Sequence, residues 1–251
     1  IQGDVRVQYP TETNWRQLDR STGPIVAGSR VRATPTGRVA LELPGALSLR
    51  IDATTELTVH SARELELVRG TIYVDSGQTV ATDSLRVMTG LGVVSDIGTQ
   101  FELTASETLL RIRVREGAVR VDGSPTDAEV LGRAGEQLSL DADGGFERDP
   151  FSPFDADWAW VQTLADTPVI EGQSLMFFLD WVARETGRPL RFDAPVTETR
   201  ARTVVLHGSA ENLSPMEALD VMLSTTDFDY RLRDDGAIVI SARVRGQAPV
   251  R

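Results

Sequence analysis

Short stretches in which apolar and polar residues alternate run through the first part of this chain. A period of two predicts β-strands that bury one face and expose the other. Turn-forming pairs such as Ser76-Gly77, Asp122-Gly123 and Asp143-Gly144 separate the stretches. No helical period of useful length appears before residue 155, so this region is predicted to be all-β. The apolar members of the stretches are Val39, Leu41 and Leu43; Leu47, Leu49 and Ile51; Leu57 and Val59; Leu65 and Leu67; Ile72 and Val74; Leu85 and Val87; Leu110, Ile112 and Val114; and Val119 and Val121.

Four glycine-containing phrases follow one another within this region. They are RGTIYV at Arg69–Val74, GTQFEL at Gly98–Leu103, VREGAVRV at Val114–Val121 and GRAGEQL at Gly132–Leu138. Each glycine is expected to mark the beginning or end of a strand, because glycine tolerates positive φ. The order and spacing of the phrases resemble the FecR domain, the periplasmic sensor region of bacterial regulators that relay iron-siderophore signals. The resemblance covers roughly residues 1–147 and implies signalling by protein contact rather than catalysis.

The architecture of the β region stays open at this point. Alternation alone does not separate a sandwich from a barrel or a stacked β-solenoid. The FecR resemblance favours a β-solenoid-like or jelly-roll-like arrangement, and we favour the solenoid. A solenoid leaves open edges at its ends, so one end would need a cap or a bound partner.

Composition narrows the choice of partners and sites. The net charge is −11 and the pI is near 4.7, so the chain repels phosphate backbones and nucleic acid is not an expected partner. Cysteine is absent, which excludes disulfides, thiolate metal ligands and cysteine nucleophiles. No run approaches the roughly 20 apolar residues that a membrane-spanning helix needs. The chain begins with Ile1, and we expect export and membrane-anchoring signals to lie outside it.

A domain boundary is predicted near Asp149–Phe154, where two prolines interrupt any regular element. Residues 155–161 then resemble a short helix with acidic residues at its start. The aromatic residues around Phe151 and Trp158 favour packing between domains in a fixed orientation. The predicted division is therefore a β domain at 1–148, a linker with a short helix at 149–167, an α+β domain at 168–243 and a frayed tail at 244–251.

The α+β domain is predicted to have the order β-α-β-β-α-β-β. Apolar residues at helical spacing begin after Ser174, and Gly187 followed by Pro189 ends that helix. A capping box with proline at the first helical position opens a second helix at Ser214. The predicted strands are Val169–Gly172, Pro189–Phe192, Thr203–His207, Phe228–Leu232 and Ala237–Ile240, the last two forming a hairpin.

The phrases of this second domain resemble the STN module of secretins and TonB-dependent transducers. Together, the two resemblances imply the periplasmic part of a membrane-anchored anti-sigma regulator. Its suspected partner is the signalling domain of a TonB-dependent outer-membrane transporter, and a sigma factor would be reached only through a cytosolic segment outside this chain. An exposed sheet edge can accept a partner strand. The residues predicted for this contact lie in the strand 203–207 and the hairpin 228–240: Val204, Leu206, Phe228, Tyr230, Ile238 and Ile240.

Catalytic, metal and cofactor sites are not predicted. His60 and His207 each lack a neighbouring ligand set or nucleophile phrase. The sequence Asp141–Gly145 begins like a calcium loop, but the distal glutamate does not follow in register, so we favour a hairpin turn. For Gly98–Phe101 we favour a tight turn and a core phenylalanine over a ligand contact.

Two other classes of function fit parts of this sequence. A cell-envelope protein that binds glycan or peptidoglycan needs exposed aromatic residues. The aromatic residues of the first 140 positions are only Tyr9, Trp15, Tyr73 and Phe101. A component of a secretion assembly could use the STN-like module, but no barrel-forming region follows it. The envelope binder is therefore the alternative to the sensor, and an enzyme is not expected.

Overall fold

The computed structural model describes residues 1–19, 21–44, 47–77, 84–123 and 130–243. The chain divides into two compact units, Ile1–Ser152 and Pro153–Arg251, and each has its own apolar core. The finer domain boundaries expected at residues 148 and 168 stay predictions. The predicted frayed tail, residues 244–251, lies outside the described residues.

The first unit is built from strands, as the alternation predicted. Among the described residues, thirteen strands form one sheet. They are β1 (Val5–Gln8), β2 (Arg16–Gln17), β3 (Ser29–Ala33), β4 (Val39–Leu43), β5 (Leu47–Ile51), β6 (Glu56–Ser61), β7 (Glu64–Asp75), β8 (Arg86–Thr89), β9 (Gly92–Ala105), β10 (Leu109–Asp122), β11 (Val130–Arg133), β12 (Glu136–Asp141) and β13 (Phe146–Pro150).

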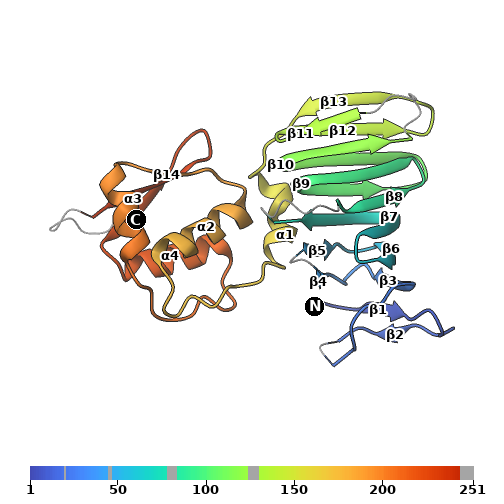
Figure 1. Cartoon of the computed structure of the whole chain (residues 1–251), viewed down its shortest axis with the longest axis horizontal. Helices are drawn as coiled ribbons and strands as arrows, with labels where there is room; N and C mark the ends of the chain where they lie inside the picture. Colours follow the sequence, from blue (N-terminus) through green and yellow to red (C-terminus); the bar gives the residue numbers. More distant parts are fainter. Residues whose placement is uncertain (20, 45–46, 78–83, 124–129, 244–251) are drawn as a thin grey trace. The chain divides into compact units, whose positions relative to one another are not determined.

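Sheet neighbours follow the chain order closely, so the strands stack one above another (Figure 1). Almost every pairing is antiparallel; the exception among the described strands of this unit is the parallel pair β7–β8. The unit is therefore mainly β and built around one large sheet. The choice between a solenoid-like and a jelly-roll-like arrangement stays a prediction.

The three longest strands, β7, β9 and β10, each pair with different neighbours along their length. In β7, residues 64–69 pair with β6 and β8, while residues 70–75 pair with β5 and β9. The buried apolar positions change from odd to even in β7 and from even to odd in β10: Leu65, Leu67, Ile72 and Val74 in the first, and Ile112, Val114, Val119 and Val121 in the second. A continuous pleat keeps one parity. We infer that the sheet folds over within these strands, so that both parts face one core.

Glycines stand at these changes of parity. Gly70 has φ +98°, and a Cβ there would lie 2.5 Å from the Cα of Thr55. Gly117 has φ +77°, and a Cβ there would lie 2.8 Å from the Cγ2 of Thr99. The prediction that glycines begin or end strands is wrong for Gly70, Gly98 and Gly117, which lie inside β7, β9 and β10. They permit a bend or bulge in a continuing strand.

The second unit combines helices with a small sheet. Its elements are a 3₁₀ helix η1 (Ala156–Trp158), α1 (Ala159–Gln162), α2 (Leu175–Thr186), β14 (Leu190–Phe192), α3 (Pro195–Thr203), α4 (Pro215–Ser224), β15 (Phe228–Leu232) and β16 (Ile238–Ala242). The sheet order is β14-β16-β15. The short helix predicted at 155–161 is confirmed as η1 and α1, with the Asp155 carboxylate accepting from the amide of Asp157.

The predicted helix boundaries follow from their capping residues. The Ser174 hydroxyl accepts a hydrogen bond from the Phe177 amide at the start of α2, and Gly187 ends this helix at φ +66°. At α4, Ser214 and Glu217 bond reciprocally as a capping box. Each helix satisfies amide groups that would otherwise lack partners.

Two predicted strands of this unit are wrong. Residues 169–172 lie outside any strand, with a turn at 171–172, and Thr203 ends α3, leaving only an isolated bridge between Val205 and Ser174. The helix α3 was not predicted because its sequence, PVTETRART, has no apolar stripe; Thr197 and Ala201 are its buried residues. The predicted hairpin is confirmed as β15–β16. The full β-α-β-β-α-β-β order is therefore not what the unit contains.

Candidate functional site

The six residues predicted to contact a partner lie together, but in the core of the second unit. Leu206, Phe228, Ile238 and Ile240 are at most 2% exposed, and they belong to one apolar cluster. Val204 and Tyr230 are partly buried and pack against it. A role for these side chains in partner binding stays a prediction. In the structure they pack in or against the apolar core of the second unit, next to its small sheet.

The outer edge of β15 is a candidate contact surface that these residues support. The Arg243 amide donates to the Asp227 carbonyl, and the Arg233 amide donates to the Ala237 carbonyl. These bonds show that the odd-numbered residues of β15 direct their backbone N–H and C=O groups toward β16. By the alternation of an antiparallel ladder, the backbone groups of Phe228, Tyr230 and Leu232 point outward.

Side chains already bond to part of this outer edge. The Phe228 amide donates to Thr226 Oγ1 at 3.2 Å, and its carbonyl accepts from Arg243 Nη2 at 3.1 Å. The Tyr230 amide donates to Asp229 Oδ1 at 2.9 Å. Capping of an exposed edge in this way limits unwanted strand pairing. Leu232, which is 49% exposed, lies beyond these caps.

Tyr230 also carries a strong side-chain bond. Its hydroxyl donates to Asp220 Oδ1 at 2.6 Å, which ties β15 to α4. Partial burial, followed by the bond to Asp220 and its charge, raises the pKa of Tyr230 to about 12. The phenol therefore stays protonated and keeps its donor over the whole physiological range.

The two histidines each meet one carboxylate. His60 Nε2 lies 3.0 Å from Glu66 Oε2, and His207 Nδ1 lies 2.8 Å from Glu171 Oε1. Within the described ranges, no group of three potential metal ligands occurs. The Asp141 carboxylate accepts from the amides of its own loop at 2.7 and 2.9 Å, as expected of a hairpin turn.

The Gly98–Phe101 phrase lies at the bend of β9. The Thr99 hydroxyl donates to Asp96 Oδ1, and the Thr99 amide donates to Ser76 Oγ at 2.8 Å. Burial raises the pKa of Asp96, although the bonds from Thr99 and Ser76 oppose this shift. Phe101 is fully buried, as predicted, so the local bonds and the core residue fix the bend.

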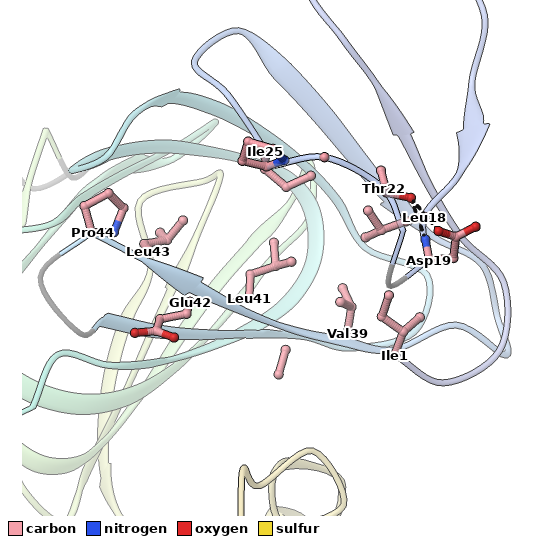
Figure 2. A pocket seen from close by; sticks show the side chains of 13 residues that line it. Ile1, Leu18, Asp19, Thr22, Ile25, Val39, Leu41, Glu42, Leu43 and Pro44 are labelled. Carbon is pink, nitrogen blue, oxygen red and sulfur yellow. Dashed lines mark hydrogen bonds between the residues drawn. The ribbon is translucent and has the colours of Figure 1, made fainter.

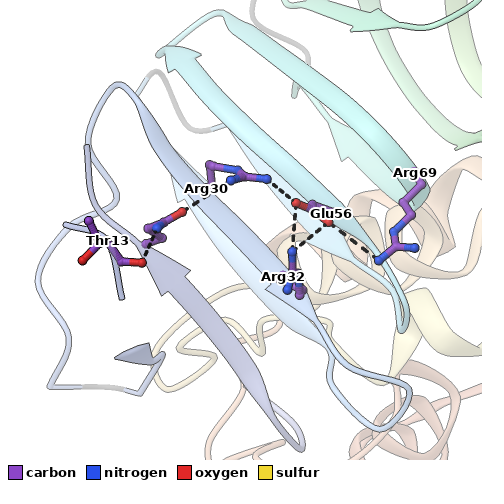
Figure 3. Close-up of polar contacts among 6 residues, drawn as sticks. Thr13, Arg30, Arg32, Glu56 and Arg69 are labelled. Carbon is purple, nitrogen blue, oxygen red and sulfur yellow. Dashed lines mark hydrogen bonds and ion pairs between the residues drawn. The ribbon is translucent and has the colours of Figure 1, made fainter. Parts of the chain in front are cut away.

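The first unit also contains an arginine cluster that was not predicted from the sequence. We use this term for Arg30, Arg32 and Arg69, whose guanidinium groups lie 2.5, 3.2 and 3.7 Å from the carboxylate of Glu56 (Figure 3). Burial alone would raise the pKa of Glu56, but the bonds and charges of Arg32 and Arg30 hold it below its ordinary value. The guanidinium carbon of Arg32 lies over the Trp15 ring, 4.4 Å from its centre. Three cations around one anion leave a local positive excess on an acidic protein.

A row of polar residues across neighbouring strands was also not predicted from the sequence. Registers between β5, β7, β9, β10 and β12 place Arg50, Tyr73, Glu102, Arg113 and Gln137 side by side. Arg113 Nε donates to Gln137 Oε1 at 2.8 Å, and the Arg50 guanidinium lies 5.5 Å from the centre of the Tyr73 ring. Only the register, which the sequence does not reveal, brings these residues together.

Comparison with known proteins finds a family model that matches part of the first unit. Residues 29–120 match the family model described as FecR protein. Two crystal structures of a protein from Parabacteroides distasonis ATCC 8503, described as "a putative anti-sigma factor", align with 86% of this chain and 99% of their own. Their identity is 17%, and the TM-scores are 0.47 and 0.46. No curated protein matches this chain.

The FecR match runs from the start of β3 into the last part of β10. It therefore contains the bends at Gly70, Gly98 and Gly117 and the whole arginine cluster. The match ends before the second unit, so the resemblance of residues 168–243 to STN stays a prediction. No helix of the described residues is long and apolar enough to cross a membrane.

Proposed function

We propose that this chain is the periplasmic signal-receiving region of a FecR-type regulator. It would bind the signalling domain of a TonB-dependent outer-membrane transporter by protein contact. The signal would pass to a sigma factor through a segment outside this chain. The observation that carries the proposal is the FecR match over residues 29–120, which spans most of the folded sheet of the first unit.

The contact surface that we propose is the outer edge of β15. A strand added there would bond to the outward backbone groups of Phe228, Tyr230 and Leu232, exchanging the caps from Thr226 and Arg243 for ladder bonds. The buried residues of the predicted contact would act as the rigid support of this edge. Replacing one set of hydrogen bonds by another costs little, so specificity would come from the exposed side chains of the strand.

Binding of the intact chain to purified transporter signalling domains tests this proposal. We expect micromolar affinity for at least one domain encoded in the source genome. Leu232→Asp places a charge on the proposed edge and should weaken binding about tenfold or more. The matched control is Val196→Asp on α3, where the side chain is 65% exposed and lies off the sheet, and it should bind within about twofold of the parent.

Two results would overturn the proposal. The first is failure of every signalling domain to bind the parent chain. The second is equal binding by Leu232→Asp and the parent, which would remove the contact from β15. Capture of peptidoglycan fragments in place of a signalling domain would favour the envelope-binding alternative. That alternative has little aromatic surface to use, because Tyr73 and Phe101 are buried.

A further inference from the structure

The arginine cluster lies in a polar row that crosses five strands of the first unit. Arg30 and Arg32 occupy alternate positions of β3, between the buried residues Ser29, Val31 and Ala33, so both share the face of the strand that points away from the core. The strand registers place five residues of the row side by side, from β2 through β1, β3 and β6 to β7: Gln17, Arg6, Arg32, Glu56 and Arg69.

The cluster holds more positive charge than its one carboxylate neutralises. Three guanidinium groups surround Glu56, which leaves a net excess of two positive charges. Arg30 Nη2 and Arg32 Nη2 donate hydrogen bonds to this carboxylate at 2.5 and 3.2 Å. Arg69 approaches it at 3.7 Å, beyond hydrogen-bond distance, and its side chain is 64% exposed. Arg69 therefore presents its N–H donors to the solvent.

The other two guanidinium groups are held in place by their neighbours. The guanidinium carbons of Arg32 and Arg30 lie 4.4 and 5.5 Å from the centre of the Trp15 ring. Gln8 accepts from Arg30 Nη1 at 3.5 Å and donates through Nε2 to the Thr13 carbonyl at 2.9 Å (Figure 3). Cations that are fixed before binding lose little side-chain entropy when an anion arrives.

We propose that the arginine cluster is a docking site for an acidic segment of a partner protein. One carboxylate of the segment takes the N–H fork of Arg69 in the bidentate geometry that guanidinium groups favour. A second carboxylate bonds to the outward N–H groups of Arg30 and Arg32. In an extended segment, side chains two residues apart share a face and lie about 7 Å apart, so acidic residues at alternate positions reach both places.

Charge favours a short acidic segment over a larger anion. The whole chain has a net charge of −11, so an anionic membrane or a nucleic acid is repelled by the rest of the surface. Beside the charges, Val68 is exposed at the register shift between β6 and β7 and offers apolar contact to a protein segment. The site lies on the first unit and goes beyond the contact proposed for β15, so either can fail without the other.

The main cavity of the first unit does not suit the same segment. It has a volume of about 540 Å³ and lies between β4 and residues 18–25 (Figure 2). The charged residues of its described lining, Asp19 and Glu42, are both acidic and would repel carboxylates. An acidic segment should therefore bind at the arginine cluster rather than in this cavity.

The test measures binding of two capped peptides to the intact chain by calorimetry. One peptide alternates glutamate with threonine, and the other is identical except that glutamine replaces every glutamate. We expect the acidic peptide to bind at least about tenfold more tightly, and to lose affinity as the salt concentration rises. Amide chemical shifts should move at Arg30, Arg32 and Arg69 as the acidic peptide is added.

Two variants with the same change of charge locate the contact. Arg69→Gln removes the exposed guanidinium and should weaken binding of the acidic peptide about tenfold. The matched control is Arg86→Gln on β8 of the same unit. Arg86 is 56% exposed and lies 3.8 Å from its own carboxylate, Glu64, so this variant should bind within about twofold of the parent.

A preference for the acidic peptide that Arg69→Gln reduces and Arg86→Gln retains supports the site. Equal binding of the two peptides, or equal effects of the two variants, overturns it. Inorganic phosphate and vesicles of phosphatidylcholine with phosphatidylglycerol are the comparison ligands. Binding of either one in place of the acidic peptide means that the cluster takes a free phosphate or a lipid headgroup, which overturns the protein contact. Self-association that Arg69→Gln abolishes assigns the cluster to a second copy of the chain and also overturns it.

Discussion

The two units of this chain reach a buried core by different routes. In the first, the core comes from strands whose buried positions change parity at a bend, so the fold depends on backbone conformation at a few glycines. In the second, the core comes from the apolar faces of α2 and α4 packed with β15 and β16, so it depends on large side chains. The same kind of substitution should therefore have different effects in the two units.

The largest effect is expected from Phe228→Ala in the second unit. Phe228 is fully buried, and such truncations cost about 3–5 kcal/mol of unfolding free energy. Hydrogen exchange during denaturant titration, followed separately in each unit, measures the change. Phe177→Ala on α2, at a position 42% exposed, is the control and should cost much less. If Phe228→Ala lost no more unfolding free energy than this control, large side chains would not be what stabilises the core of the second unit.

The corresponding change in the first unit is Gly70→Ala. It adds only one methyl group, yet it forces a side chain into a left-handed conformation and against the backbone of Thr55. Strain and overpacking together should cost about 3 kcal/mol. Gly90→Ala is the matched control, because a Cβ at Gly90 meets nothing within 4 Å. If both substitutions had equal effects on the denaturation midpoint, the bend at Gly70 would not be essential.

These contrasts also explain what the sequence could predict. Alternation identified the strands because each needs only two or three apolar residues in phase, as in Leu47, Leu49 and Ile51. The capping residues Ser174 and Ser214 located the starts of α2 and α4. Alternation could not show that Leu65 to Val74 is one bent strand, because a change of parity resembles a break between two strands.

The errors in the second unit, and the clusters that the sequence did not reveal, have a similar origin. The helix α3 has no apolar stripe, and the apolar run Val204–Leu206 suggested a strand where only one bridge forms. The predicted contact residues lie in a strand and a hairpin whose side chains are mostly apolar, and their apolar character places Phe228 and Ile240 in the core. The arginine cluster depends on register between β3, β6 and β7, which local sequence does not encode.

A smaller effect is expected at the capping residue of α2. Ser174→Ala removes the hydroxyl that accepts from the Phe177 amide, and loss of an N-cap costs about 1 kcal/mol. Ser174→Asp retains an acceptor and should recover most of this loss. Thermal unfolding of the two variants measures the difference. Equal stability of Ser174→Ala and the parent would show that tertiary packing alone holds the start of α2.

The smallest expected effect is a pH dependence carried by Tyr230. Its folded pKa, about 12, lies above the ordinary value of 10.0, so the folded state favours the protonated phenol. The stability that this bond contributes is complete below pH 10 and is lost as the pH rises toward 12. Tyrosinate absorbance should show one late-titrating tyrosine that disappears in Tyr230→Phe. A Tyr230 that titrates at its ordinary pKa would contradict the bond to Asp220.

The central claim, that this chain receives a signal by protein contact, is tested most directly by hydrogen-exchange mapping of the intact chain with and without a transporter signalling domain. The account predicts added protection in β15 on binding, centred on Tyr230 and Leu232. Binding without protection in β15 would contradict the proposed surface, and the absence of binding by every domain of the source genome would contradict the function itself.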